Sequence, residues 1–223
     1  MDFRHEWKHE INLCDLITVR QRLRAVAEID PHAAGGKYEI RSLYFDNIRD
    51  KALREKLEGL SRREKFRIRS YNGDTSHIQL EKKMKRDGLG RKRKARLTAE
   101  ETQALVSGRY DWMQKSREPL VIELYSKMMS QGLRPKTIVE YTREPFMFGP
   151  GNVRVTLDYG LRTGILCTDF LNPDCVTVPA GKPVVIMEVK WDAFLPDIIR
   201  DAVQIPGRRT AAFSKYAACR IYG

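Results

Sequence analysis

Charged side chains recur at every second position along several short segments of this chain. Residues two apart on a β-strand point to the same face, so each of these sets would share one face. The sets are Arg4, Glu6, Lys8 and Glu10; Lys65, Arg67 and Arg69; Glu81, Lys83 and Lys85; Lys92, Lys94 and Arg96; Tyr141 and Arg143; Arg154, Thr156 and Asp158; and Glu188 and Lys190. Faces rich in Lys and Arg with a few carboxylates suit the binding of phosphate groups.

The simplest interpretation of each charged face is exposure to solvent, which is common in antiparallel sheets. Two features favour an enclosed site instead. The pattern Glu-x-Lys recurs at residues 6–8, 81–83 and 188–190, and Glu188 and Lys190 lie in a segment that is otherwise strongly apolar. If such faces line a lumen, the buried cations require a polyanion to neutralise them, and the carboxylates suit a hard divalent metal.

The secondary-structure signals predict an α+β fold. Strand-like segments end at turn signals such as Asn72-Gly73, and they cover 3–11, 38–47, 63–72, 76–85, 91–97, 136–146, 152–159 and 183–191. Helical periodicity and caps indicate helices at 12–28, after Thr98, at 118–131 and at 195–203. We predict a closed antiparallel β-barrel tunnel of about eight strands with peripheral helices. Without a linker or low-complexity tract, residues 1–223 are predicted to form a single domain.

The composition bounds the partners and the compartment. Lys and Arg number 41 against 29 Asp and Glu, and the net charge of +12 favours an anionic partner. No apolar run has the length of a membrane span or a signal peptide, which favours the cytoplasm. The cysteines at 14, 167, 175 and 219 lack CxxC spacing and are predicted to be reduced.

The same residues resemble a known family. The matching stretches are RHEWK (4–8), SLYFDN (42–47), KFRIRSY (65–71), LEKK (80–83), KAR (94–96), YTR (141–143), RVTLD (154–158), IMEVK (186–190) and SKY (214–216). In this order they resemble the VTC domain, the catalytic domain of the vacuolar transporter chaperone polyphosphate polymerase and its bacterial relatives. That family belongs to the triphosphate tunnel metalloenzymes.

The resemblance implies an eight-stranded tunnel that binds ATP and inorganic polyphosphate with a divalent metal, Mn²⁺ or Mg²⁺. It implies transfer of the γ-phosphoryl group to a growing chain. Carried over to this sequence, the phosphate ligands would be Lys8, Arg67, Arg69, Lys83, Lys94, Arg143 and Arg154, with Tyr141 assisting. Glu188 would be the metal ligand and catalytic, Ser214 and Lys215 would close the phosphate site, and Lys215 would be the catalytic lysine. The alternative for Lys215 is a surface position on a terminal helix. A separate membrane-protein partner stays open, and no nucleic-acid partner is expected.

One departure from the superfamily bears on the reaction. Its hydrolases and cyclases carry Glu-x-Glu-x-Lys on the first strand, whereas this chain has Arg4 at the first position. Losing that carboxylate disfavours a two-metal hydrolytic site and favours the polymerase branch. The assignment of Lys94 and Arg96 stays open, because residues 91–96 are basic at nearly every position.

The same residues are compatible with other functions. A tripolyphosphatase on the same fold differs only in the attacking group, and a non-catalytic polyphosphate- or nucleic-acid-binding module would also fit the net charge. Residues 5–9 read HExxH, a zinc-protease signature that requires a helix, and Gly35-Gly36-Lys37 lacks Walker A spacing. The sequence leaves open the product length, the identity of the metal and the oligomeric state.

Overall fold

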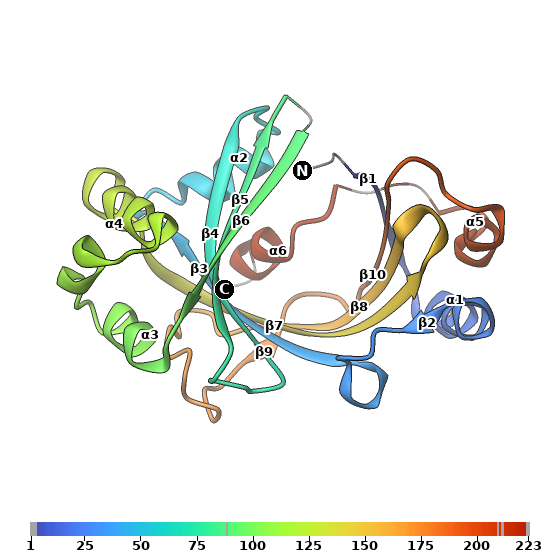
Figure 1. Ribbon diagram of the computed structural model, residues 1–223, viewed down its shortest axis with the longest axis horizontal. Helices are drawn as coiled ribbons and strands as arrows, with labels where there is room; N and C mark the ends of the chain where they lie inside the picture. The colour runs from blue at the N-terminus through green and yellow to red at the C-terminus, as the bar shows by residue number, and fades with distance from the viewer. Residues whose placement is uncertain (1–3, 88, 209, 211, 222–223) are drawn as a thin grey trace. The chain divides into compact units, whose positions relative to one another are not determined.

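The computed structural model describes residues 4–87, 89–208, 210 and 212–221 (Figure 1). The strands are β1 (His5–Ile11), β2 (Glu28–Ile29), β3 (Tyr38–Asp46), β4 (Arg63–Tyr71), β5 (Ile78–Arg86), β6 (Leu89–Leu97), β7 (Arg134–Phe148), β8 (Val153–Thr163), β9 (Val178–Pro179) and β10 (Val185–Trp191). The helices are α1 (Leu13–Val26), α2 (Lys51–Leu57), α3 (Ala99–Val106), α4 (Pro119–Gln131), α5 (Asp197–Val203) and α6 (Lys215–Ile221), and short 3₁₀ turns cover 34–36, 111–115 and 150–152.

Every predicted strand and helix is present within a few residues of its predicted bounds, and the α+β class is confirmed. Residue 3, the predicted start of the first strand, lies outside the described residues. The sequence did not predict α2 or the two-residue strands β2 and β9, and it offered the terminal helix α6 only as the alternative for Lys215. In the part of the chain that the structure describes, no helix is long and apolar enough to cross a membrane.

The predicted closure of the barrel is wrong. The hydrogen-bonded strand order is β1-β10-β8-β7-β3-β4-β5-β6, and it runs between two ends. Within the described ranges no ladder joins β6 to β1, so the sheet is open. β6 has the composition of an edge strand, because a run of Lys and Arg side chains discourages pairing with a further strand.

The chain divides into two compact units, each assembled from separate stretches. The first unit contains Met1–Glu39, Tyr141–Leu161 and Lys182–Phe213, and the second contains Ile40–Glu140, Arg162–Gly181 and Ser214–Gly223. The long strand β7 contributes its first half to the second unit and its second half to the first.

In the first unit, α1 and α5 cover one face of β1, β10 and β8 (Figure 1). α1 begins at a capping box formed by Asn12 and Asp15, as its sequence predicts. Its buried residues Leu16, Val19 and Leu23 belong to the same apolar core as the strands. The strand residues of this core include Ile11, Val153, Val155, Leu157, Val185, Met187 and Val189. These alternate with the charged positions, so the charged set lies on the opposite face.

In the second unit, α3 and α4 cover one face of strands β3 to β6, and α6 lies on the other side (Figure 1). The capping box of Thr98 and Glu101 opens α3, and Gly132 ends α4 with a φ of 68°, a left-handed conformation that suits glycine. The residues that β3 to β6 contribute to this core are Leu43, Phe45, Phe66, Ile68, Ile78, Leu80, Ala95 and Leu97. The residues that alternate with this apolar set, among them Arg67, Arg69 and Glu81, lie on the opposite face.

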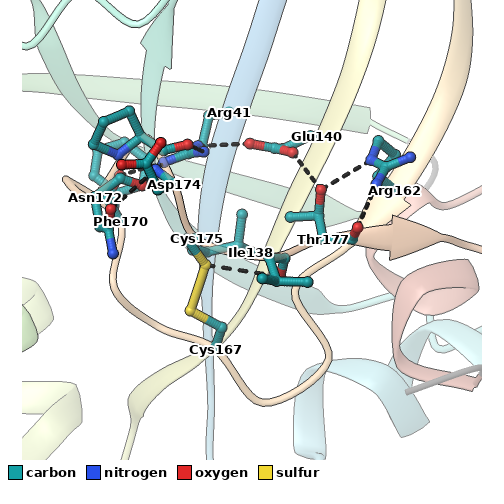
Figure 2. A network of polar contacts seen from close by, with 12 residues as sticks. Arg41, Ile138, Glu140, Arg162, Cys167, Phe170, Asn172, Asp174, Cys175 and Thr177 are labelled. Atoms are coloured by element: carbon teal, nitrogen blue, oxygen red, sulfur yellow. Dashed lines mark hydrogen bonds and ion pairs between the residues drawn. A yellow bond between two sulfur atoms is a disulfide. The ribbon is translucent and has the colours of Figure 1, made fainter.

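A polar network holds the loop that follows β8 (Figure 2). Arg41 Nε donates to Glu140 Oε1 at 2.6 Å, and its guanidinium also donates to the carbonyl of Phe170 at 3.2 Å. Thr177 donates to the other oxygen of Glu140 at 2.8 Å. The loop carries a disulfide between Cys167 and Cys175, which corrects the prediction that all cysteines are reduced. The two cysteines are 8 positions apart in sequence, which is not a CxxC spacing. The loop held by Arg41 and Glu140 brings them together.

Candidate functional site

The register of the second unit confirms that the charged residues of neighbouring strands share one face. Arg67 pairs with Tyr44 on one side and with Glu81 on the other, and Glu81 pairs with Lys94. Directly opposed residues of an antiparallel ladder point to the same face. The other members of this face are Ser42, Lys65, Arg69, Gln79, Lys83, Lys92 and Arg96. We call these residues, with Tyr44, Arg67, Glu81 and Lys94, the cationic face.

Arg67 is fixed by a buried ion pair at the centre of the cationic face. Its Nε donates to Glu81 Oε2 at 2.7 Å, and its Nη1 donates to the hydroxyl of Tyr44 at 2.8 Å. The exposed fraction is 6% for Arg67 and 0% for Glu81. Burial alone would raise the pKa of Glu81, but the charges of Arg67, Arg69 and Lys92 together hold that pKa well below its usual range. Glu81 therefore stays ionised and orients Arg67 before any ligand binds.

Arg69 and Lys83 flank this pair. Arg69 is 3% exposed, and its Nε donates to the hydroxyl of Ser42 at 3.0 Å. Lys83 is half-buried on β5, where the register places it between Lys65 and Lys92. Arg67, Arg69 and Lys83 were all predicted as phosphate ligands. The structure brings them together on adjacent strands.

Lys92 is a member of this cluster that the site prediction missed. It forms an ion pair with Glu81, whereas the predicted ligand Lys94 is exposed. Burial, only partly offset by Glu81, lowers the pKa of Lys92 to about 7. The signal was weak because residues 91–96 are basic at nearly every position. The register of β5 with β6 sets Lys94 directly opposite Glu81, and Lys92, two residues earlier on the same face, reaches Glu81 diagonally.

A pH dependence of stability follows from Lys92. Its pKa of about 7 in the folded protein lies below the ordinary lysine value of about 10.4. Between these values the unfolded chain binds more protons than the folded one, so stability rises with pH across that window. We expect the gain in unfolding free energy from about pH 7 to about pH 9, measured in urea, to be larger in the wild type than in Lys92→Met. Lys85→Met, which removes an exposed lysine of β5, is the control, and its gain in unfolding free energy should equal that of the wild type. An equal gain in wild type and Lys92→Met would contradict the assignment.

Ser214 and Lys215 lie on the same side of the second unit as the cationic face. Lys215 is half-buried at the first position of α6. Ser214 precedes it, and its hydroxyl accepts from the backbone N–H of Ala217 at 3.3 Å. Tyr216 stacks on the ring of Tyr44 with the centroids 4.9 Å apart, which places α6 against the cationic face.

The first unit holds a second charged cluster around Glu188. Glu188 is 7% exposed, and one of its oxygens lies 2.9 Å from Lys190 Nζ and 3.3 Å from Lys8 Nζ. Burial would raise the pKa of Glu188, but a hydrogen bond from Glu6 and the charges of Lys190, Lys8 and Arg143 hold it well below its usual range. Partial burial and the neighbouring Glu188 raise the pKa of Glu6. Two carboxyl groups therefore converge here among cations.

Arg143 joins this cluster to β8. Its Nε and Nη2 donate to the two oxygens of Asp158 at 2.7 Å each, and its Nη2 lies 3.9 Å from Glu188. The side chain of Tyr141, 4% exposed, lies beside Arg143 with 5.6 Å between guanidinium and ring centroid. Arg154 lies one strand away from Lys190 in the register and is 3.4 Å from Asp30.

The predicted residues thus fall into two groups. The first unit brings together Lys8, Tyr141, Arg143 and Glu188, with Arg154 on the same face. The second unit brings together Arg67, Arg69 and Lys83, with Lys94, Ser214 and Lys215 on the same side. Glu6 and Lys92 extend these groups. A signal for Glu6 was present, because it lies two residues before Lys8 and so shares its face.

The carboxylates of the first unit fit a divalent metal only in part. Among the described residues no group of three or more His, Cys, Asp or Glu is placed to hold a metal by itself. Asp158 is already engaged by Arg143, which leaves Glu6 and Glu188. Mg²⁺ is commonly bound by one or two carboxylates together with substrate phosphates. This pair fits a metal that shares its coordination with a bound phosphate.

The start of β1 bears on two sequence predictions. Arg4 precedes the strand and its Nε lies 2.7 Å from Asp192, so it pairs away from Glu188. His5 stacks on Trp191 with centroids 5.3 Å apart, and His5 to His9 lie in a strand. The HExxH signature requires a helix, so its zinc-protease reading does not fit this structure.

Comparisons with known proteins identify the family. The sequence profile of the VTC domain matches residues 3–221. Among solved structures, a "putative adenylate cyclase" from Bacillus halodurans is similar, with a TM-score of 0.54 and 14% identity over 85% of this chain and 80% of that chain. The PH1012 protein from Pyrococcus horikoshii has a TM-score of 0.48 and 13% identity over 99% of each chain. No curated protein matches. At these identities the first structural likeness shows a shared fold only. The profile match spans nearly the whole sequence, and the chain therefore belongs to the VTC domain family.

Proposed function

We propose that this chain is a metal-dependent polyphosphate polymerase that transfers the γ-phosphoryl group of ATP to the end of a polyphosphate chain. One observation carries the proposal. Along β4, β5 and β6, Glu81 is the single carboxylate among the positions of the cationic face, and it lies buried against Arg67 and Lys92. The face keeps an excess of positive charge that a linear polyanion would neutralise.

The arginines of the cationic face are suited to phosphate. A guanidinium presents five N–H donors in a rigid fork, so Arg67 can hold Glu81 and Tyr44 and still donate to phosphate oxygens. Because Arg67 and Arg69 are nearly buried, a thin phosphate chain can reach them more easily than a nucleic-acid duplex can. Lys83, Lys92 and Lys94 would add point charges along the same strands.

In the first unit, Glu188 and Glu6 would hold the divalent metal. When bound, Mn²⁺ or Mg²⁺ neutralises charge that develops on the phosphate oxygens. Lys8, Arg143 and Arg154 would contact phosphate oxygens there, with Tyr141 packed behind Arg143. In the second unit, Lys215 is proposed as the catalytic lysine, with Ser214 as a hydrogen-bonding neighbour.

The choice of a polymerase over a tripolyphosphatase rests on Arg4. The hydrolytic branch carries a carboxylate at this position, and here an arginine occupies it and pairs with Asp192. A second metal would therefore lack that ligand. Attack by a phosphate chain needs positioning of two polyanions, which a strongly cationic surface favours.

An assay of products tests the proposal. The purified chain is incubated with ATP and Mn²⁺, and ADP, free phosphate and acid-insoluble polyphosphate are measured. If the chain is a polymerase, the amount of ADP should equal the number of phosphoryl groups found in polyphosphate. Free phosphate without polyphosphate would identify a hydrolase, and no turnover despite tight tripolyphosphate binding would identify a binding module. Samples treated with a chelator are the control for metal.

A further inference from the structure

Tyr216 has two partners in the second unit, one for its hydroxyl and one for its ring. The hydroxyl donates to Asp46 Oδ2 at 2.7 Å, and the ring stacks on Tyr44 at an angle of 25°. Tyr216 is only 1% exposed. Burial and the charge of Asp46 raise the pKa of Tyr216 far above its ordinary value, so the hydroxyl remains a donor. Neither contact was predicted from the sequence.

The hydroxyl of Tyr216, on α6, donates to a carboxylate that also caps α2. The same carboxylate, Asp46, accepts from the backbone N–H groups of Ala52 at 2.9 Å and Leu53 at 3.2 Å, in the first turn of α2. An ion pair connects the other end of α6 to the residue before α2, because Arg220 Nη2 lies 3.1 Å from both oxygens of Asp50. A helix of this length is marginal on its own in water. These contacts therefore decide where α6 lies.

The ring of Tyr216 contacts Arg67, the proposed phosphate ligand, through one intervening side chain. It packs on Tyr44, whose hydroxyl accepts from Arg67 Nη1 at 2.8 Å. The guanidinium of Arg67 also lies 5.7 Å from the centroid of the Tyr44 ring. One residue is thus adjacent in sequence to Lys215 and in contact with the side chain that orients Arg67.

We propose that Tyr216 is a positioning residue of the phosphate site: its hydroxyl fixes α6 and with it Lys215, and its ring fixes Tyr44 and with it Arg67. The inference rests on the proposed function, which assigns Arg67 to phosphate binding and Lys215 to transfer. Because the hydroxyl and the ring act on different groups, their losses should be seen in different measurements.

Two substitutions separate these roles. Tyr216→Phe keeps the stacked ring and removes the hydroxyl, so kcat for polyphosphate formation should fall about tenfold while affinity for tripolyphosphate changes less than about twofold. Tenfold corresponds to about 1.4 kcal/mol, close to the net value of one hydrogen bond. Tyr216→Leu removes both contacts, so affinity should also fall about tenfold. A merely structural residue would not divide its effects in this way.

Tyr159→Phe is the matched control. The hydroxyl of Tyr159 donates to Glu144 Oε1, also at 2.7 Å, in the first unit, and neither residue is a member of the cationic face. This variant loses a hydrogen bond of the same kind and should keep the kcat and affinity of the wild type. Wild-type kcat in Tyr216→Phe, or an equal loss of kcat in Tyr159→Phe, would overturn the proposal.

Hydrogen exchange provides a measurement that needs no turnover. Tripolyphosphate held by Arg67 should slow exchange of the α6 amides in the wild type, including Ala218, whose N–H donates to the Ser214 carbonyl at 2.9 Å. The protection should disappear in Tyr216→Leu. If the wild type makes no polyphosphate, the proposed function fails, and the exchange result still decides whether Tyr216 couples α6 to the phosphate site. Absence of protection in the wild type would overturn that coupling.

Discussion

The Glu188→Gln variant is expected to lose about 100-fold or more of its turnover while it keeps its affinity for tripolyphosphate. The substitution preserves the size of the side chain and removes the negative charge that a divalent metal requires. Lys8, Lys190 and Arg143, which surround this carboxylate, all remain, so attraction for a polyanion should persist or increase. Steady-state kinetics across a range of Mn²⁺ concentrations and titration calorimetry with tripolyphosphate measure the two effects.

Glu144→Gln is the control for this experiment. Glu144 is also 7% exposed and belongs to the first unit, but it pairs with Arg20 at 2.7 Å in the network that includes Tyr159. Neutralising it should cost comparable stability without an effect on turnover. If Glu188→Gln retains wild-type activity at saturating Mn²⁺, Glu188 is not the metal ligand. If both variants lose activity equally, the loss reflects damage to the first unit.

Arg69→Ala is expected to weaken tripolyphosphate binding by about 1.5–3 kcal/mol, the range for hydrogen bonds to charged groups, or roughly 10- to 150-fold in Kd. Arg69 is the cleaner target because its Nε donates to the neutral hydroxyl of Ser42, whereas the Nε of Arg67 donates to a buried carboxylate. Arg67→Ala should weaken binding similarly, but it also strips the buried carboxylate of Glu81 of its main partner. Breaking a buried ion pair from one side costs about 3–5 kcal/mol of stability.

Titration calorimetry with tripolyphosphate and with a short DNA duplex tests the arginines. Arg41→Ala is the control variant, since Arg41 pairs with Glu140 and belongs to the face of β3 that points away from Tyr44. Tripolyphosphate should bind the control normally and should bind the wild type more tightly than the duplex does at physiological salt. Unchanged affinity in both Arg67→Ala and Arg69→Ala would remove these residues from the phosphate site.

The alternation of charged and apolar residues predicted the composition of both charged faces. On β4, Phe66 and Ile68 pack in the core while Arg67 and Arg69 lie on the opposite face, as a period of two requires. The resemblance then assigned roles to these side chains. The alternation along one strand does not predict which residues of neighbouring strands lie opposite each other. Residues 91–96, basic at nearly every position, do not specify the register that sets Lys94 opposite Glu81, nor the diagonal ion pair that Lys92 forms with Glu81.

Two helices outside the main sequence prediction, α2 and α6, depend on side chains that lie outside the helices themselves. α2 follows Asp50, which has a left-handed φ of 49° and makes no side-chain cap. Its cap comes from Asp46, at the end of the preceding strand. α6 depends on Asp46 and Asp50, both more than a hundred residues away in sequence. The open sheet was missed because strand number and alternation are compatible with closed and open sheets alike.

Because each unit is assembled from separate stretches of chain, the protein cannot be divided into two fragments that each contain one unit. Each unit is composed of three stretches of chain, and β7 continues from one into the other as a single strand of 15 residues. No single truncation point yields an intact half, so a fragment of either unit would need at least two artificial joins. The Cα pairs that contact each other are mostly distant in sequence, and such topologies form slowly because the chain must close long loops before those contacts exist. Synthesis of the last stretch, which carries α6, is therefore required before the second unit has all of its parts.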